Sequence, residues 1–297
     1  MNLRDGAVAN IPEAWWTLYM TDTWSSYGLR LPKQISRIEG LPVPSNDALF
    51  YSGHLPNHVF GSDEDAQHSI LAQMVQLHFI LIEVNSFNSR TVAGDLDEAE
   101  TIQIVNSLSQ QLDDWNTSLP PHLRDTPENL AHHAARGLGR LFVALYLGYY
   151  NYGQLLFFQF LHSGSHSPFI QSHLFASKCK KYATQLCDIT YRAHELPGCE
   201  VYYMMAGHVL AIASTVQIYA LVFAEEEEEI QAAKARLQRN FEILTKLKDY
   251  WPTLDISFER FQEFHRVCQV SAEESFRMDR WMLTFLLEFA KPIRSVA

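Results

Sequence analysis

The stretch Ile70–Val84, ILAQMVQLHFILIEV, decides the fold class of this chain. A side chain returns to the same face of an α-helix every 3.6 residues, and the apolar residues here recur at spacings of three and four. The residues that follow this spacing are Ile70, Leu71, Met74, Val75, Leu77, His78, Leu81 and Val84. Ser62, followed by the acids Asp63–Asp65, suits a helix start because hydroxyls cap helices and acids favour the positive end. The sequence therefore predicts a helix of about seven turns from Ser62.

The same periodicity predicts helices along the rest of the chain. We expect them at residues 13–27, where Pro12 suits the first turn, and after the break at Gly94 and Asp95, in a helix that includes Ile102 to Trp115. Further helices are expected at 138–161, 172–194, 200–224, 226–250, 255–269 and 273–290. No segment alternates apolar and polar residues as a strand does, and no repeat recurs at a fixed period. The predicted fold is all-α, a large irregular multi-helix bundle.

The predicted domain organisation follows from the distribution of proline and glycine. Residues 29–61 are rich in both, which favours an extended connection with many turns that packs over the bundle. Residues 1–61 are therefore interpreted as an N-terminal helix with this connection. Residues 62–297 are interpreted as one continuous helical domain.

Composition argues against a nucleic-acid surface. The 297 residues are 47% hydrophobic and carry a net charge of −11. A protein that binds phosphates needs clustered cations, and the tightest group of the 23 basic residues here is Lys178, Lys180 and Lys181. We expect no direct contact with nucleic acid.

The four cysteines, Cys179, Cys187, Cys199 and Cys268, contain no C-x-x-C pair. Such a set predicts free, buried thiols in a cytosolic or nuclear protein. The segment Met1–Asn10 has no apolar run of the secretory kind.

Two uncharged segments, Leu141–Leu161 and Val201–Ala224, reach the roughly 20 residues that span a bilayer. Both contain amides or hydroxyls, and the second also contains His208. The centre of a large helical bundle requires equally apolar helices, so we favour two core helices over membrane spans.

Candidate chemistry is sparse, and we assign no catalytic residue, cofactor or metal. The histidine pairs His54/His58 and His162/His166, with His173, have spacings seen in zinc sites, but both pairs fall in expected loops without an H-E-x-x-H motif. No phosphate-binding glycine loop, G-x-S-x-G elbow or dinucleotide motif occurs.

Three other features have a structural and a functional interpretation. The acid run Glu225–Glu229 is interpreted as a solvated helix start, and otherwise as an acidic activation patch. His208 is interpreted as a core histidine rather than a general base. An aromatic cluster is interpreted as core, and otherwise as the lining of a small-molecule pocket. It comprises Tyr146, Tyr149, Tyr150, Tyr152, Phe157, Phe158 and Phe160.

Five short motifs, in order from about residue 14 to residue 252, carry a family resemblance. They are Ala14–Pro32 (AWWTLYMTDTWSSYGLRLP), Leu41–Phe50 (LPVPSNDALF), Leu119–Leu123 (LPPHL), Leu161–His162 with Ser167–Ile170 (SPFI), and Leu244–Leu247 with Trp251–Pro252. Together they resemble the middle regulatory region of fungal zinc-cluster (Zn2Cys6) transcription factors. Ile11–Glu13 replaces the family's arginine pair. The zinc cluster itself needs six cysteines, so four cannot build it.

The resemblance implies a nuclear, all-helical regulatory domain that acts on transcription of metabolic or biosynthetic genes, including those of secondary metabolism. The implied partner is a protein, either a DNA-binding transcription factor or a second copy of the chain, and a small-molecule effector is a further expectation. A cytoplasmic location is the alternative. Two other hypotheses stay open: an enzyme of fungal secondary metabolism on the same fold with an aromatic-lined pocket, and a truncated gene product.

The hallmark residues Trp15, Trp16, Asp22 and Trp24 are interpreted as structural. So many large rings on a short helix predict that it is clamped between the later bundle helices. Asp22 then needs a cationic or amide partner. Arg30 is the local candidate, and Arg136 or Arg140 are distant ones.

Overall fold

The computed structural model describes residues 11–29, 31–44, 47, 67–161 and 171–273. About 80% of these residues are helical, and none of them lies in a strand. The helices are α2 (Ile11–Leu29), α5 (Ile70–Ala93), α6 (Glu98–Ser118), α7 (Pro127–Ala135), α8 (Gly139–Phe157), α9 (Ser172–Glu195), α10 (Met204–Phe223), α11 (Glu227–Lys248) and α12 (Asp255–Glu273). Short 3₁₀ turns follow three of them: η1 (Pro121–Leu123), η2 (Phe158–Phe160) and η3 (Pro252–Leu254). The predicted all-α, multi-helix fold is confirmed.

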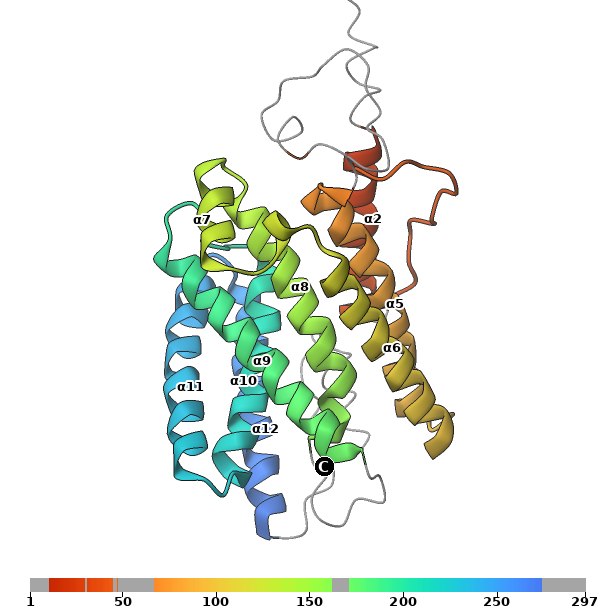
Figure 1. The fold of residues 1–297 in the computed structure, drawn as a ribbon. Helices are drawn as coiled ribbons and strands as arrows, with labels where there is room; N and C mark the ends of the chain where they lie inside the picture. The colour runs from red at the N-terminus through yellow and green to blue at the C-terminus, as the bar shows by residue number, and fades with distance from the viewer. Residues whose placement is uncertain (1–10, 30, 45–46, 48–66, 162–170, 274–297) are drawn as a thin grey trace, which may run out of the picture.

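Helix α8 lies at the centre of the bundle (Figure 1). It packs against α9 most extensively, and also against α5, α6, α7 and α10. Helix α10 forms a second centre, in contact with α9, α11 and α12. The predicted helices at 138–161 and 200–224 thus lie at the centres of the bundle, as the uncharged segments Leu141–Leu161 and Val201–Ala224 indicate.

The aromatic cluster on and after α8 is core. Tyr146, Phe157 and Phe158 have no exposed surface, and the other four rings of the cluster are at most 5% exposed. Gly153 allows α8 and α9 to approach closely, because a Cβ atom there would lie 2.5 Å from the Tyr182 ring. The interpretation of this cluster as core packing is confirmed.

Helix α5 begins later than the sequence predicts. Residues 62–66 lie outside the described residues, but the chain is non-helical at Ser69, which caps α5 by accepting the Ala72 N–H. The Asp47 carboxylate is buried there and accepts the N–H groups of Ile70 and Leu71 at 2.5 and 3.1 Å. Ser62 itself lies outside the described residues, but the continuous helix predicted from it is wrong, because the chain leaves the helical conformation at Ser69, where Ser69 and the distant Asp47 cap α5. Helix α5 ends as predicted, with Gly94 in the left-handed conformation at φ 78°.

Helix α7 was not predicted. Thr126 caps it by accepting the Asn129 N–H, and Pro127 occupies its first turn. Both are known helix-start residues, so the signal was present in the sequence. The helix has only nine residues, too few to show a clear apolar period.

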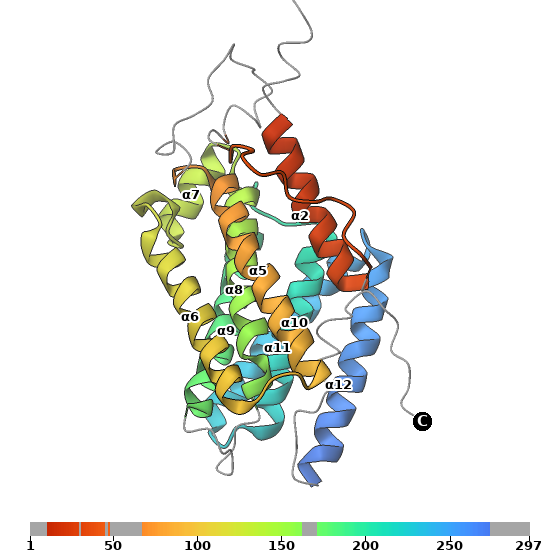
Figure 2. The ribbon, with the colours of Figure 1, turned by 90° about the vertical axis from the view of Figure 1, so that its right-hand side faces the viewer.

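Helix α2 lies on the outside of the bundle, along α5 (Figures 1 and 2). Its buried residues Trp16, Tyr19 and Met20 form a small cluster with Leu71 and Val75 of α5, separate from the main core. Leu18, on its outer side, is 58% exposed. The helix is therefore not clamped between bundle helices, and Ile35, Leu41 and Val43 of the extended segment 31–44 pack against its small cluster.

Hydrogen bonds attach this segment to α2. The Trp16 ring N–H donates to the Pro42 carbonyl at 2.9 Å. The Asp22 carboxylate accepts the backbone N–H groups of Gln34 and Ile35 at 3.0–3.2 Å. Of the two kinds of partner expected for Asp22, a cation or an amide, the structure shows backbone amides. In the described structure Asp22 forms no ion pair with Arg136 or Arg140. Arg30, the local candidate, lies outside the described residues.

Two of the described helices, α5 and α10, are long and apolar enough to cross a membrane by composition. In the most apolar 18-residue stretch of each helix, 67% of α5 and 83% of α10 is buried inside the bundle. Both helices pack as the core helices of a globular protein do.

Candidate functional site

A pocket of about 310 Å³ lies between α2, α5, α8 and the start of α10. Its walls therefore come from four segments that are far apart in the sequence. Small-molecule sites in proteins occupy roughly 300–1,000 Å³ and are mostly apolar, so this pocket is at the lower end of that range.

Helix α8 creates the space. Leu141, Ala144, Gly148 and Tyr152 recur at spacings of three and four, so they share the face that borders the pocket. Ala144 and Gly148 are the small members of this row. A Cβ atom on Gly148 would lie 3.4 Å from the Tyr152 Oη and 3.6 Å from Leu77, which are ordinary contacts. The hollow is therefore open space rather than a site of forced close packing.

Helix α2 forms the outer wall. Met20 and Trp24 line the pocket, and the Trp24 ring lies 5.8 Å from the Tyr152 ring between centroids. Thr17, Thr21 and Ser25 also line it and are exposed, so they form the rim. Their spacing of four places three hydroxyl groups in one row along the opening.

Four of the seven methionines of the chain line this pocket: Met20, Met74, Met204 and Met205. Methionine has three rotatable bonds and a polarizable sulfur, so it adapts to ligands of different shapes and makes favourable contacts with aromatic rings. Methionines from three helices, α2, α5 and α10, therefore give the pocket an adjustable lining.

Among the described residues that line it, there is no aspartate, glutamate, lysine, arginine or histidine. Its polar groups are hydroxyls, the three on the α2 rim and those of Tyr152 and Tyr203. Burial raises the pKa of Tyr152 well above its ordinary value, so this hydroxyl stays protonated.

One edge of the pocket continues into an exposed aromatic surface. Tyr203 and Met204 line the pocket and are themselves 37% and 39% exposed. Beside them the exposed Tyr202 packs on Tyr250 with ring centroids 5.0 Å apart. The Trp251 ring N–H donates to the Tyr202 carbonyl and fixes this arrangement.

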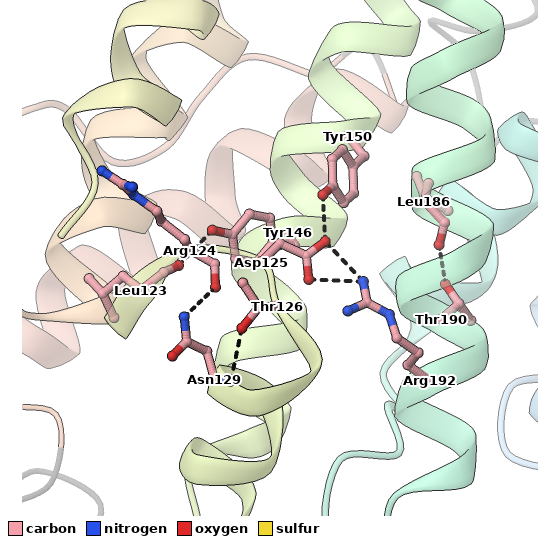
Figure 3. Close-up of polar contacts among 10 residues, drawn as sticks. All are labelled: Leu123, Arg124, Asp125, Thr126, Asn129, Tyr146, Tyr150, Leu186, Thr190 and Arg192. Atoms are coloured by element: carbon pink, nitrogen blue, oxygen red, sulfur yellow. Dashed lines mark hydrogen bonds and ion pairs between the residues drawn. The ribbon is translucent and has the colours of Figure 1, made fainter. Parts of the chain in front are cut away.

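The most concentrated polar network in the described structure surrounds Asp125, between η1 and α7 (Figure 3). Arg192 of α9 donates to both carboxylate oxygens of Asp125 at 2.9 Å. The Tyr150 hydroxyl of α8 donates to the same carboxylate at 2.5 Å, and Tyr146 donates to the Leu123 carbonyl at 2.6 Å. Burial, followed by the charge of Asp125, raises the pKa of Tyr150 far above its ordinary value.

This network is structural. Both oxygens of Asp125 are engaged, and the contacts join the connection between α6 and α7 to α8 and α9. Tyr146 and Tyr150 are two residues from Ala144 and Gly148, which places them about 200° around the helix. Helix α8 therefore uses one face to anchor the linker and the other to border the pocket.

The structure places several sequence-predicted residues outside any site. His54, His58, His162 and His166 lie outside the described residues, and His173 is exposed on α9. In the described part of the chain, no group of three or more histidine, cysteine or acidic side chains is positioned to hold a metal ion. All four cysteines are free and buried, as predicted.

The charged candidates form ordinary surface pairs. Lys178 contacts Ser109 and Asp113, and Lys180 pairs with Glu229 at 2.7 Å. The acid run provides the first turn of α11, so its interpretation as a helix start is confirmed.

His208 is buried in α10, as expected for a core histidine. Burial, with the nearby Arg260, holds its pKa well below the ordinary value.

Sequence reasoning missed the pocket, apart from Tyr152 in the aromatic cluster. The available signal was the pair of small residues, Ala144 and Gly148, four positions apart in a helix of bulky residues. That signal indicates a hollow on one face, but nothing local shows which segments enclose it.

In comparisons with known proteins, no family model matched the chain, and no curated protein or solved structure matched it either.

Proposed function

We propose that this chain is a helical regulatory domain that binds a small molecule in the pocket beneath α2 and acts on transcription through a protein partner. The observation that carries the proposal is the pocket itself, about 310 Å³ in volume, with an apolar, methionine-rich lining. Its transcriptional part rests on the resemblance of the five motifs to the regulatory region of fungal zinc-cluster factors.

Binding is favoured over catalysis by the groups that line the pocket. A catalytic site needs a nucleophile, acid or base whose pKa is suited to its task. Here the lining offers hydroxyls and thioethers, and the buried Tyr152 has a pKa raised away from neutrality. This supports an effector site over the alternative of an enzyme.

The position of α2 supports a regulatory role. Met20 belongs both to the pocket wall and to the small cluster that holds α2 against α5. A ligand in contact with Met20 and Trp24 therefore changes the free energy of docking of α2. A ligand shifts a conformational equilibrium only through such differential contacts.

The charge of the chain supports action through a partner. With a net charge of −11, and with Lys178 and Lys180 paired to acids, the chain offers no cationic surface for phosphates in its described part. A DNA-binding protein that recruits this chain would supply the contact with DNA, most directly at a nuclear promoter.

A tethered reporter assay tests the proposal. The full chain is fused to an unrelated DNA-binding domain, and transcription from a promoter with its site is measured. We expect the fusion to change reporter output and Ala144→Phe, which fills the pocket, to alter that change. Ala235→Phe, at an exposed position of α11, is the matched control and keeps the wild-type response. A fusion without effect, or one indifferent to Ala144→Phe, contradicts the proposal.

A further inference from the structure

We infer that the ligand of this pocket is an uncharged aromatic molecule with one hydroxyl group, which donates a hydrogen bond to Thr21 on the α2 rim. This inference rests on the proposed function, because it assumes that the pocket is a ligand site. It adds the chemical class of the ligand.

The absence of charged side chains among the described lining residues selects against ions. A carboxylate or ammonium that enters the pocket loses its hydration, and the lining residues offer it no opposite charge. The hydroxyls available there compensate only a part of that loss. An anion is also repelled by the net charge of −11 that the chain carries. A neutral ligand avoids both penalties.

The rings and sulfur atoms of the lining favour an aromatic ligand. Trp24 and Tyr152 lie with their ring centroids 5.8 Å apart at one wall. Met20, Met74 and Met205 complete the enclosure from three helices. Thioether sulfur makes favourable contacts with aromatic rings, and methionine adjusts to a flat shape. A planar ring therefore gains from contacts on several sides.

The hydrogen bond that Thr21 already makes determines whether the ligand's polar group should be a donor or an acceptor. The Thr21 hydroxyl donates its proton to the Thr17 carbonyl at 2.8 Å, one helical turn earlier. A hydroxyl has one donor and two acceptor positions, so the exposed Thr21 hydroxyl at the pocket rim is left with acceptor positions. Its complement in a ligand is a donor such as a hydroxyl group. An ether or a ketone at the same position gains nothing from Thr21.

Three probes that share one ring system test this class: 2-naphthol, 2-methoxynaphthalene and 2-naphthoate. Their affinities for the full chain are measured by equilibrium dialysis at neutral pH. We expect 2-naphthol to bind about fivefold more tightly than 2-methoxynaphthalene, the effect of one neutral hydrogen bond. We expect 2-naphthoate to bind at least about tenfold more weakly than 2-naphthol.

Two substitutions assign these differences to the pocket. Thr21→Val, at an exposed position, should remove the preference for 2-naphthol over 2-methoxynaphthalene and leave the affinity for 2-methoxynaphthalene unchanged. Ala144→Phe should weaken binding of every probe, and Ala235→Phe should weaken none.

The outcomes separate the two proposals. Two results would show that the inferred class is wrong: 2-naphthoate binding as tightly as 2-naphthol, or Thr21→Val keeping the preference for 2-naphthol over 2-methoxynaphthalene. In either case the ligand site stands if Ala144→Phe still blocks binding. If no probe binds in a way that Ala144→Phe weakens, the proposed effector site fails, and the inferred class fails with it.

Discussion

Replacement of His78 by leucine should make the protein less sensitive to acid. His78 is 1% exposed on α5, with its ring 5.6 Å from the Tyr19 ring of α2. Neither ring nitrogen has a hydrogen-bond partner in the described structure. Burial, assisted by the charge of Lys33, lowers the pKa of His78 from 6.5 to about 3.

The sign and size of the effect follow from this pKa. Between about pH 6.5 and pH 3 the unfolded chain binds a proton at His78 and the folded protein does not. Stability is therefore fully present above pH 6.5 and is lost as the pH falls, at about 1.4 kcal/mol per pH unit. From pH 7.5 to pH 5.0 the loss attributable to His78 is about 2 kcal/mol.

Urea unfolding, followed by tryptophan fluorescence at pH 7.5 and 5.0, measures this loss. His78→Leu should lose about 2 kcal/mol less than the wild type between the two pH values. Other titrating groups, including His208, cancel in the difference between the two proteins. His173→Leu, at an exposed position of α9, should behave as the wild type. An equal loss in the wild type and His78→Leu would refute the reasoning, because His78 would then titrate alike in the folded and unfolded states.

Three substitutions test the packing. Trp16→Ala should lower the free energy of unfolding by roughly 3–5 kcal/mol, because a 2% exposed indole is removed from the α2–α5 contact; thermal melts measure it. Gly153→Ala should cost about 1–3 kcal/mol, because its Cβ would lie 2.5 Å from the Tyr182 ring and force α8 and α9 apart; urea midpoints measure it. Asp125→Asn should cost roughly 2 kcal/mol through the lost charge at Arg192, and a double-mutant cycle with Arg192→Leu isolates this coupling.

Each of these substitutions has a control of the same chemistry. Leu18→Ala is on the exposed side of α2 and should change the melting temperature little. Gly148→Ala adds the same methyl group to α8 where the nearest atom is 3.4 Å away, so it should be tolerated. Asp113→Asn breaks a more exposed pair, with Lys178, and should cost far less than Asp125→Asn. Equal effects within any pair would contradict the packing assigned to that position.

The helices were predictable where their signals are local. Helix α6 carries a complete capping box at Asp97 and Glu100, and Gly94 stops α5 in the conformation that glycine favours. The start of α5 was misplaced although its N-cap, Ser69, is a local signal; the second capping group, Asp47, is distant in sequence. Local rules describe only those capping groups that are neighbours in the chain.

The pocket was largely unpredictable for a related reason. A pocket forms where small side chains, here those of Ala144 and Gly148, leave space between packed helices. Its shape also depends on which helices pack opposite them. Its lining extends from Thr17 to Val209, and no pairwise pattern in one sequence links these positions. The resemblance suggested a regulatory domain, and only the three-dimensional arrangement shows the pocket.

The outer position of α2 also has a consequence for biosynthesis. Trp24 leaves the ribosome about 180 residues ahead of Met205, on the opposite wall of the pocket. At about 5–20 residues per second, this interval lasts roughly 10–40 s. During most of this interval α5, against which α2 packs, is already translated, but the pocket side of both helices lacks the wall that α10 supplies, so nascent chains expose apolar surface to chaperones that cover such surface. The pocket is thus completed only when α10 has been translated, and conditions that deplete such chaperones should reduce the yield of ligand-competent protein.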